Sequence, residues 1–423
     1  MAYTRRIIDD ELDELFPELA AIAIDGAKGV GKTATASARA NTVLALDSPA
    51  LRATIDADPA GALARKRPIL FDEWQRVPQV WDVVRRAIDS DREGGQFLFA
   101  GSASPQPGAT AHSGAGRIIR LRMRPMTVQE RGLSRPTVAL SDLLEGTAGD
   151  LSGATDLNLK SYVDAIVDSG FPGLQDLPNR AFRAQLDSYI RNIVDRDIPE
   201  SGVMVRRPDV LIDWLRAYAA ATSSTASYTE ILDAATAGMT DKPHRETTAT
   251  YRDVLAQIWV LDPVPAWTAS GSPLKRLHSS QKHHLVDPAL AVRLLGMTPE
   301  SLLDGNGKPL GPQEGTLLGS LFESLVTLCV RVPAQAAEAE VRHLRTRNGD
   351  HEVDLILVRP DGRVLALEVK LSGTITNSDV RHLHWLRKQI GDRLIDAVVI
   401  NTGPGAYRRP DGIGVVPLGL LGP

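Results

Sequence analysis

The sequence predicts an α/β protein of several domains, with a parallel sheet at the N-terminus, a helical middle and a second α/β unit at the C-terminus. Three observations lead to this prediction: an apolar run that enters a glycine-rich loop at Gly26, helical periodicity between about residues 158 and 257, and two apolar strands joined by a short turn at Asp361. The chain has 423 residues, which is more than one ordinary core serves, so we expect two or three domains.

The composition is that of a globular protein. Apolar residues make up 43% and charged residues 24%, and the net charge is −4, so a nucleic-acid surface would have to be a local patch. The single cysteine, Cys329, lies in an apolar run and is expected to be a buried thiol. The N-terminal segment has no apolar stretch, and we see no later run long enough to span a bilayer. We therefore expect no membrane association and a cytoplasmic location.

The glycine-rich loop reads GAKGVGKT and fits the pattern G-x-x-x-x-G-K-[ST] completely. Glycines let backbone N–H groups turn inward around phosphates, Lys32 would reach the β- and γ-phosphates, and the Thr33 hydroxyl would bind Mg²⁺. The context fits as well, because AAIAID reads as a buried strand before the loop and a helix is expected from Thr33 to Arg39. The sequence thus predicts a nucleotide site formed by Gly26, Ala27, Lys28, Gly29, Val30, Gly31, Lys32 and Thr33.

Two acids follow the short apolar strand Ile69–Phe71. We expect Asp72 to hold Mg²⁺ and Glu73 to polarise the attacking water, on a strand next to that of the loop. The next strand, QFLFAGSAS, ends near Ser102, which could contact the γ-phosphate or the water, or only cap the following helix.

A basic stretch comes next, and as a strand it would carry arginines on one face and apolar residues on the other. The stretch reads Ile119, Arg120, Leu121, Arg122, Met123, Arg124. The arginines could face phosphates, supply an arginine finger to a neighbouring subunit, or form a solvated stripe paired with carboxylates. Arg117, which stands apart after Gly116, is the first choice for a finger.

Taken together, these motifs in residues 1–135 resemble the N-terminal module of a bacterial and archaeal group of AAA+-type P-loop ATPases. In that group a domain of unknown function usually follows. Three later stretches resemble this second domain, so the resemblance covers nearly the whole chain: SGFPGL (Ser169–Leu174), YIRNIVDRDIPE (Tyr189–Glu200) and HHLVDPALAVRLLG (His283–Gly296). The resemblance implies ATP binding and hydrolysis with Mg²⁺ as cofactor.

The middle of the chain is expected to hold a linker and helical segment (136–205) and a winged-helix-like unit (206–268). The second unit shows three amphipathic helices, with Ser227 or Thr229 as a cap, and then a short apolar strand. Its third helix could enter a DNA major groove, and a packing or protein-contact module fits equally well. The groove-facing candidates are His244, Arg245, Thr247, Thr248 and Tyr251.

Residues 269–423 hold the hairpin. Its turn, Pro-Asp-Gly, favours a three-residue loop centred on Asp361, so facing residues should have numbers that sum to 722. Asp354 then lies opposite Glu368, and Lys370 shares their face. Two carboxylates and a lysine on one face suit a divalent metal. A ladder of exposed ion pairs, with Glu352 opposite Lys370, is the alternative.

The spacing D-x(13)-E-x-K on a hairpin resembles the PD-(D/E)XK nuclease fold, so residues 269–423 would form a restriction-endonuclease-like domain. Asp354 and Glu368 would be metal ligands, Lys370 the catalytic lysine, and Glu323 a further acid. Val353 stands where that family has proline. A later helix would offer contacts to a nucleic-acid backbone: Arg381, His382, His384, Arg387 and Lys388.

Three functions follow from these features. In the first, ATP hydrolysis regulates a Mg²⁺-dependent nuclease that acts on DNA. In the second, the ATP state switches binding to a protein or nucleic acid, and the C-terminal domain is only a docking surface. In the third, the protein is a ring-type remodelling ATPase, which requires a homo-oligomer.

Overall fold

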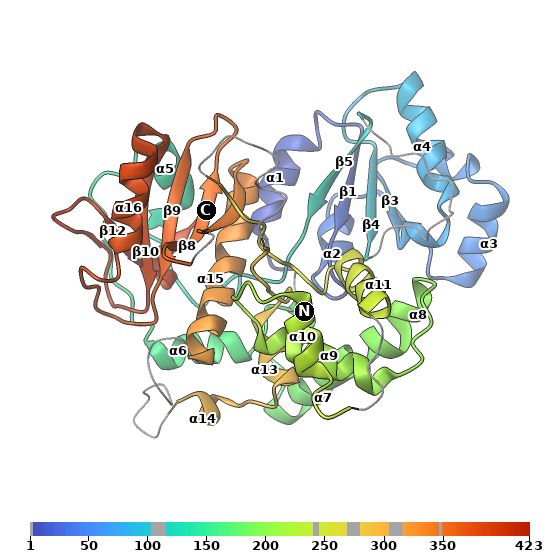
Figure 1. Cartoon of the computed structure of the whole chain (residues 1–423). Helices are drawn as coiled ribbons and strands as arrows, with labels where there is room; N and C mark the ends of the chain where they lie inside the picture. Colours follow the sequence, from blue (N-terminus) through green and yellow to red (C-terminus); the bar gives the residue numbers. More distant parts are fainter. Residues whose placement is uncertain (1–2, 103–115, 240–244, 269–279, 304–315, 347–348) are drawn as a thin grey trace.

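The computed structural model describes residues 3–102, 116–239, 245–268, 280–303, 316–346 and 349–423. Two sheets lie side by side, and the helices of the middle region lie along one end of both (Figure 1). One continuous apolar cluster includes Ile24 from the first sheet, Leu211 from the middle region and Leu367 from the second sheet. The three regions are therefore packed as one body rather than joined by flexible links.

The N-terminal sheet has the order β2-β3-β4-β1-β5, and all its pairings are parallel. Its strands are β1 (Ala21–Asp25), β2 (Thr42–Ala45), β3 (Ile69–Asp72), β4 (Phe97–Gly101) and β5 (Ile118–Arg122). The carboxyl ends of parallel strands meet at one edge, which is where such sheets bind ligands. We expected the strand that carries the acids, β3, to lie next to β1, the strand that leads into the loop. This prediction is wrong, because β4 lies between them.

Helices cover this sheet: α1 (Ile7–Leu15), α2 (Lys32–Ser37), α3 (Pro49–Ala57) and α4 (Gln79–Ser90), with short 3₁₀ turns η1 (Gly61–Ala64) and η2 (Trp74–Arg76). Residues of β1 and β4 are buried throughout, as expected for strands covered on both faces. We predicted that the strand β5 and the residues after it carry arginines on an outward face and apolar residues on the buried face, and this is wrong in two respects. Ile119 is exposed, and Arg124 is buried against the middle region.

The middle region is helical and contains α6 (Leu159–Val167), η3 (Pro172–Leu174), α7 (Asn179–Asn192), a π-helix (Ile193–Asp197), α8 (Ile198–Glu200), α9 (Pro208–Ala220), α10 (Tyr228–Ala235), α11 (Arg245–Gln257), α13 (Pro288–Leu294) and α14 (Pro299–Leu302). Before it come β6 (Val138–Ala139) and α5 (Leu140–Glu145). Helix α13 packs against α6, α7 and α9, so residues near 290 join this region rather than the C-terminal sheet.

Three helices, α9 to α11, occupy the place of the expected winged helix, and Ser227 caps α10 as predicted. The strand expected after α11 forms isolated bridges, such as Leu261 with Leu285, within the described residues. Thr248 and Tyr251 are buried, so these two candidates cannot face a DNA groove, whereas Thr247 is exposed. His244, which we expected at the start of that helix, lies outside the described residues.

The C-terminal region is a mixed sheet in the order β11-β12-β10-β9-β8-β7. Its elements are α15 (Leu317–Ala336), β7 (Glu340–Arg345), β8 (Glu352–Val358), β9 (Val364–Val369), α16 (Arg381–Ile390), η5 (Gly391–Arg393), β10 (Leu394–Asn401), β11 (Tyr407–Arg408), β12 (Gly414–Pro417), η6 (Leu418–Leu420) and β13 (Leu421–Gly422), which pairs with β6. In the β8–β9 hairpin Leu355 faces Leu367 and Val358 faces Val364, which confirms the predicted register. Gly362 adopts the left-handed conformation (φ 81°) that the turn requires.

Helix α15 corrects the expectation that no apolar run in the chain is long enough to span a bilayer. It has 20 residues, and its most apolar 18-residue window has a mean hydropathy of 1.5, so by length and composition alone it could cross a membrane. However, 67% of its most apolar window is buried inside the protein, and the core helix of a soluble protein passes the same test. Cys329 is buried in this helix, as predicted, and burial raises the pKa of its thiol to about 12.

Candidate functional site

The glycine-rich loop connects β1 to α2 at the carboxyl edge of the first sheet. Gly26 has a φ of 155°, and a Cβ atom there would lie 2.2 Å from the carbonyl oxygen of Met123, so only glycine fits. The Lys32 ammonium lies inside the loop and donates hydrogen bonds of 2.8 Å to the carbonyls of Gly26 and Ala27. Burial lowers the pKa of Lys32 to about 8. The loop therefore holds its own cation at the place where phosphates are expected.

The two predicted Mg²⁺ ligands are brought together. The Thr33 hydroxyl donates a hydrogen bond of 2.9 Å to Oδ1 of Asp72, although the two residues are 39 positions apart. Burial raises the pKa of the Asp72 carboxyl. A hydroxyl and a carboxylate beside a phosphate-binding loop are ligands that suit Mg²⁺. Within the described residues, no group of three or more His, Cys, Asp or Glu side chains is arranged to hold a metal by itself.

Glu73 begins the turn after β3 in the left-handed conformation, with a φ of 53°. Its backbone N–H donates to the carbonyl of Ala100 on the neighbouring strand (2.8 Å), and its carboxylate accepts a hydrogen bond of 2.5 Å from Nε2 of Gln75. A residue held in a sparsely populated conformation by its surroundings is common at functional sites. We did not predict the part played by Gln75, because no spacing rule connects it to Glu73.

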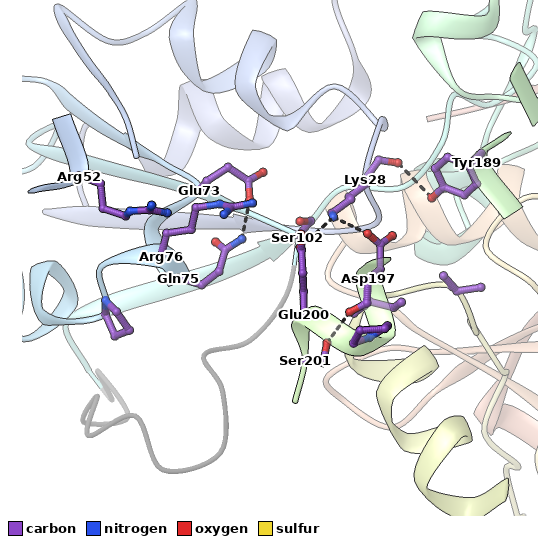
Figure 2. Close-up of a pocket in the computed structure, with 14 residues that line it drawn as sticks. Lys28, Arg52, Glu73, Gln75, Arg76, Ser102, Tyr189, Asp197, Glu200 and Ser201 are labelled. Carbon is purple, nitrogen blue, oxygen red and sulfur yellow. Dashed lines mark hydrogen bonds and ion pairs between the residues drawn. The ribbon is translucent and has the colours of Figure 1, made fainter. Parts of the chain in front are cut away.

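Ser102 lies between the acids and the loop, at the end of β4. Its side chain is buried, and its hydroxyl has no hydrogen-bond partner among the described residues. Ser102 lines a cavity of about 580 Å³ together with Lys28 and Glu73 (Figure 2). A buried hydroxyl that faces a cavity without a partner is suited to a polar ligand. The alternative, a cap on the following helix, falls on residues outside the described ranges.

The opposite wall of this cavity comes from the middle region. The Tyr189 hydroxyl donates a hydrogen bond of 3.1 Å to the backbone carbonyl of Lys28, and the Lys28 ammonium lies 2.5 Å from Oδ1 of Asp197. Figure 2 shows both contacts crossing from the loop to the middle region. Arg52 and Arg76 also line the cavity. These two cations were not among the predicted site residues, because nothing in their local sequence marks them.

A second cavity, of about 670 Å³, lies on the other side of the loop. Gly31, Ala34 and Thr35 line it from the side of the loop and α2, and Tyr3 lines it from the N-terminal segment. The remaining wall includes Met123, Met126, Pro172, Gly173 and Gln175. The loop thus lies between two cavities: this one beside the start of α2, and the first one beside the acids.

Two of the three stretches that resembled a second domain contact the loop, and the third holds the first in place. In the first, Phe171 and Pro172 pack over Gly29 and Gly31, and in the second lies Tyr189. The third stretch acts through Asp287, which accepts hydrogen bonds from the Ser169 hydroxyl (2.9 Å) and the Gly170 N–H (2.7 Å). The middle region is therefore built around the loop.

The arginines in β5 and directly after it have structural partners. Arg120 bonds Asp25 at 2.9 Å, while Arg122 and Arg124 both reach the buried Asp262. Arg331 of α15 also lies 2.8 Å from Asp262. Burial alone would raise the pKa of Asp262, but the three arginines hold it well below its usual range. One carboxylate thus connects all three regions, and Arg122 and Arg124 are not available to phosphates.

Arg117 precedes β5 at the edge of the sheet opposite the loop. Ile118 pairs with Ala21 at the start of β1, whereas the loop follows Asp25 at its end. Arg117 forms an ion pair of 2.8 Å with Asp89. A finger at this position would serve a nucleotide bound to another copy of the chain, and its role stays a prediction.

The carboxylates of the C-terminal hairpin do converge, but around a lysine that we did not predict. Nζ of Lys282 lies 2.7 Å from Glu323, 3.0 Å from Asp354 and 3.0 Å from Glu352. The Lys282 side chain is only 1% exposed. Burial opposes its charge, yet the three carboxylates raise the pKa of Lys282 well above its usual value. A cation that belongs to the chain itself therefore lies among these acids.

Glu368 and Lys370 lie beside this cluster. Lys370 bonds Oε1 of Glu368 at 2.8 Å, and the N–H of Val369 donates to Oδ2 of Asp354 at 2.8 Å. Burial, together with the charge of Asp354, raises the pKa of Glu368 to about 8. The alternative ladder with Glu352 opposite Lys370 is not what forms, because Glu352 pairs with Lys282 and Arg345. On α16, His384 and Arg387 bond Asp411.

Comparison with known proteins identifies three segments. An AAA domain family matches residues 19–131, and two domains of unknown function, DUF8612 and DUF4143, match residues 159–301 and 318–421. Uncharacterized proteins of Mycobacterium bovis and Mycobacterium tuberculosis are each 27% identical over 362 residues, which is 85% of this chain and 70% of the relative. A crystal structure of a Vibrio cholerae protein covers 94% of both chains at 11% identity, but its TM-score is 0.19. The AAA match supports a nucleotide-binding, ATPase-like N-terminal part.

Proposed function

We propose that this protein binds ATP with Mg²⁺ at the loop Gly26–Thr33 and hydrolyses it. One observation carries the proposal: Lys32, the Thr33–Asp72 pair and Glu73 meet at a single edge of the first sheet. These are the groups needed to hold a triphosphate and to activate water. The bound Mg²⁺ would neutralise charge on the phosphate oxygens, and Thr33 and Asp72 are the residues that would hold it.

The two cavities suggest where each part of the ATP molecule would bind. The triphosphate would follow the loop, with its γ-phosphate in the cavity that contains Glu73 and Ser102. The base and ribose would enter the second cavity, between Tyr3 and the Pro172–Gly173 turn. Glu73 is the proposed general base, and Gln75 sets its direction through the hydrogen bond to the carboxylate.

Nucleotide titration with purified full-length protein tests the binding half of this proposal. We expect Lys32→Ala to weaken binding of Mg²⁺–ATP by about 10- to 100-fold, which is the loss of a buried charge-assisted contact. Lys160→Ala is the matched control, because Lys160 is exposed and pairs with Asp164 on its own helix. Equal affinity of the wild type and Lys32→Ala for ATP would overturn the proposal.

A second candidate function concerns the C-terminal hairpin. Asp354, Glu368 and Lys370 lie together, which favours a Mg²⁺-dependent nuclease that acts on DNA. Lys282 favours the other reading, a docking module whose binding the ATP state controls, because its ammonium already lies among the acids where a metal would bind. Incubation with DNA and RNA in Mn²⁺ or Mg²⁺ separates the two. Cleavage that Asp354→Asn abolishes supports the nuclease, and absence of cleavage by the wild type supports the docking module.

A further inference from the structure

Lys28 belongs to the glycine-rich loop, but its ammonium forms ion pairs with carboxylates of the middle region. Its ammonium lies 2.5 Å from Asp197 and 3.6 Å from Glu200. The Asp197 side chain is only 9% exposed, whereas that of Lys28 is 43% exposed. The hydrogen bond from the Tyr189 hydroxyl to the Lys28 carbonyl also fixes α7, the helix that precedes Asp197, against the loop. The contact thus joins a partly solvent-exposed ammonium to a nearly buried carboxylate.

The carboxylate is placed by an unusual piece of backbone. Asp197 is the last residue of the π-helix Ile193–Asp197, which continues α7 directly. Such π-helical turns are uncommon and often lie at functional sites. A nearly buried carboxylate is costly without a cation beside it, so this segment depends on Lys28 for its present packing.

The position of Lys28 in the cavity indicates a competitor for Asp197. Lys28 shares the cavity with Glu73 and Ser102, which is the side where the third phosphate of a nucleotide would lie. A γ-phosphate carries more charge than one carboxylate and would attract the same ammonium. The loop backbone would bind the α- and β-phosphates and Lys32 would reach the β- and γ-phosphates, so a diphosphate would leave Lys28 with Asp197.

We propose that Lys28 and Asp197 form a γ-phosphate sensor, which rests on the ATP binding proposed above. A nucleoside triphosphate takes Lys28 from Asp197, and a diphosphate does not. Loss of its cation leaves Asp197 buried and unpaired, so the segment from Ile193 to Glu200 moves or loosens. The pair therefore sets the preference between triphosphate and diphosphate, and it reports the third phosphate to the middle region.

Affinities for the non-hydrolysable analogue AMP-PNP and for ADP, both with Mg²⁺, test the sensor. Asp197→Asn removes the competitor, so we expect AMP-PNP to bind about three- to fivefold more tightly, with ADP unchanged. In a Lys28→Met background the Asp197→Asn change should have no effect on either nucleotide. Asp195→Asn is the matched control, because Asp195 is an exposed acid two residues earlier.

Hydrogen exchange on the unmodified protein gives a second readout that no folding defect can disturb. Amides of residues 193–200 should exchange faster with AMP-PNP bound than with ADP bound. Equal exchange in the two complexes overturns the sensor, as does an Asp197→Asn effect that is the same for both nucleotides or persists without Lys28. Failure of the wild type to bind either nucleotide would instead refute the proposed ATP site.

Discussion

Nζ of Lys282 lies 3.0 Å from Oδ1 of Asp354, at the point where the hairpin sequence predicts a divalent cation. The two residues are 72 positions apart. Facing carboxylates need a positive charge between them, and here a buried ammonium provides it for Asp354, Glu323 and Glu352. This contact changes the interpretation of the C-terminal region, because a lysine of the chain itself lies among its acids.

Removal of this cation should destabilise the protein strongly. Lys282→Met removes the cation that three carboxylates share, although Glu352 keeps its ion pair with Arg345, and breaking a buried ion network costs about 3–5 kcal/mol. Denaturation in urea would measure the loss, and Lys160→Met, an exposed lysine, should change the apparent free energy of unfolding by less than about 1 kcal/mol. We expect millimolar Mn²⁺ to restore part of the stability of Lys282→Met only. An equal gain in the wild type would show that a metal binds beside Lys282.

Asp262 should be equally sensitive, because three arginines depend on it. Asp262→Asn leaves Arg122, Arg124 and Arg331 buried with no counter-charge, and we expect a loss of about 3–5 kcal/mol in the same assay. Asp213→Asn is the control, since Asp213 pairs with Arg216 at the surface. A loss as small as that of the control would mean that the three regions are held together mainly by apolar contacts.

The pH dependence of nucleotide affinity should report Lys32. Its pKa is lowered to about 8 by burial, and the charge of a bound triphosphate would raise it. Below pH 8 the lysine is already charged. Above pH 8 binding must take up a proton, so affinity should fall, by at most about tenfold per pH unit. Titrations with AMP-PNP from pH 7 to 9.5 would measure this, and a flat profile would place Lys32 outside the phosphate site.

The second cavity can be filled by mutation. Gly173 lines it, and a Cβ atom there would meet nothing within 4 Å. Gly173→Phe should therefore leave stability within about 0.5 kcal/mol and weaken nucleotide binding about tenfold or more. Gly149→Phe, at another open position, is the matched control. Unchanged affinity in Gly173→Phe would mean that the base binds elsewhere.

Features with a local or periodic signal could be predicted from the sequence. The loop Gly26–Thr33 needs glycines at fixed offsets, and Gly26 indeed leaves no room for a Cβ atom. The hairpin register follows from its turn, and Leu355 faces Leu367 as expected. These predictions succeeded because the interactions that decide them lie within a few residues.

The features that could not be predicted from the sequence are contacts between segments that lie far apart in the chain. Lys28 meets Asp197 across 169 positions, and Arg124 meets Asp262 across 138. Alternation in β5 indicated which residues share a face, but not that the middle region covers Arg124. Likewise, the apolar composition of α15 could not reveal that other elements bury it. No spacing rule could place Lys282 among the acids, because its partners come from α15 and β8.

The most direct test of the ATPase proposal is phosphate release from Mg²⁺–ATP by the wild type and by Glu73→Gln. Glutamine keeps the shape of the side chain but cannot accept a proton from water. We predict hydrolysis by the wild type, a fall on the order of 10²- to 10⁴-fold in Glu73→Gln, and ATP affinity within about threefold of the wild type. Hydrolysis by Glu73→Gln at the wild-type rate would contradict the account.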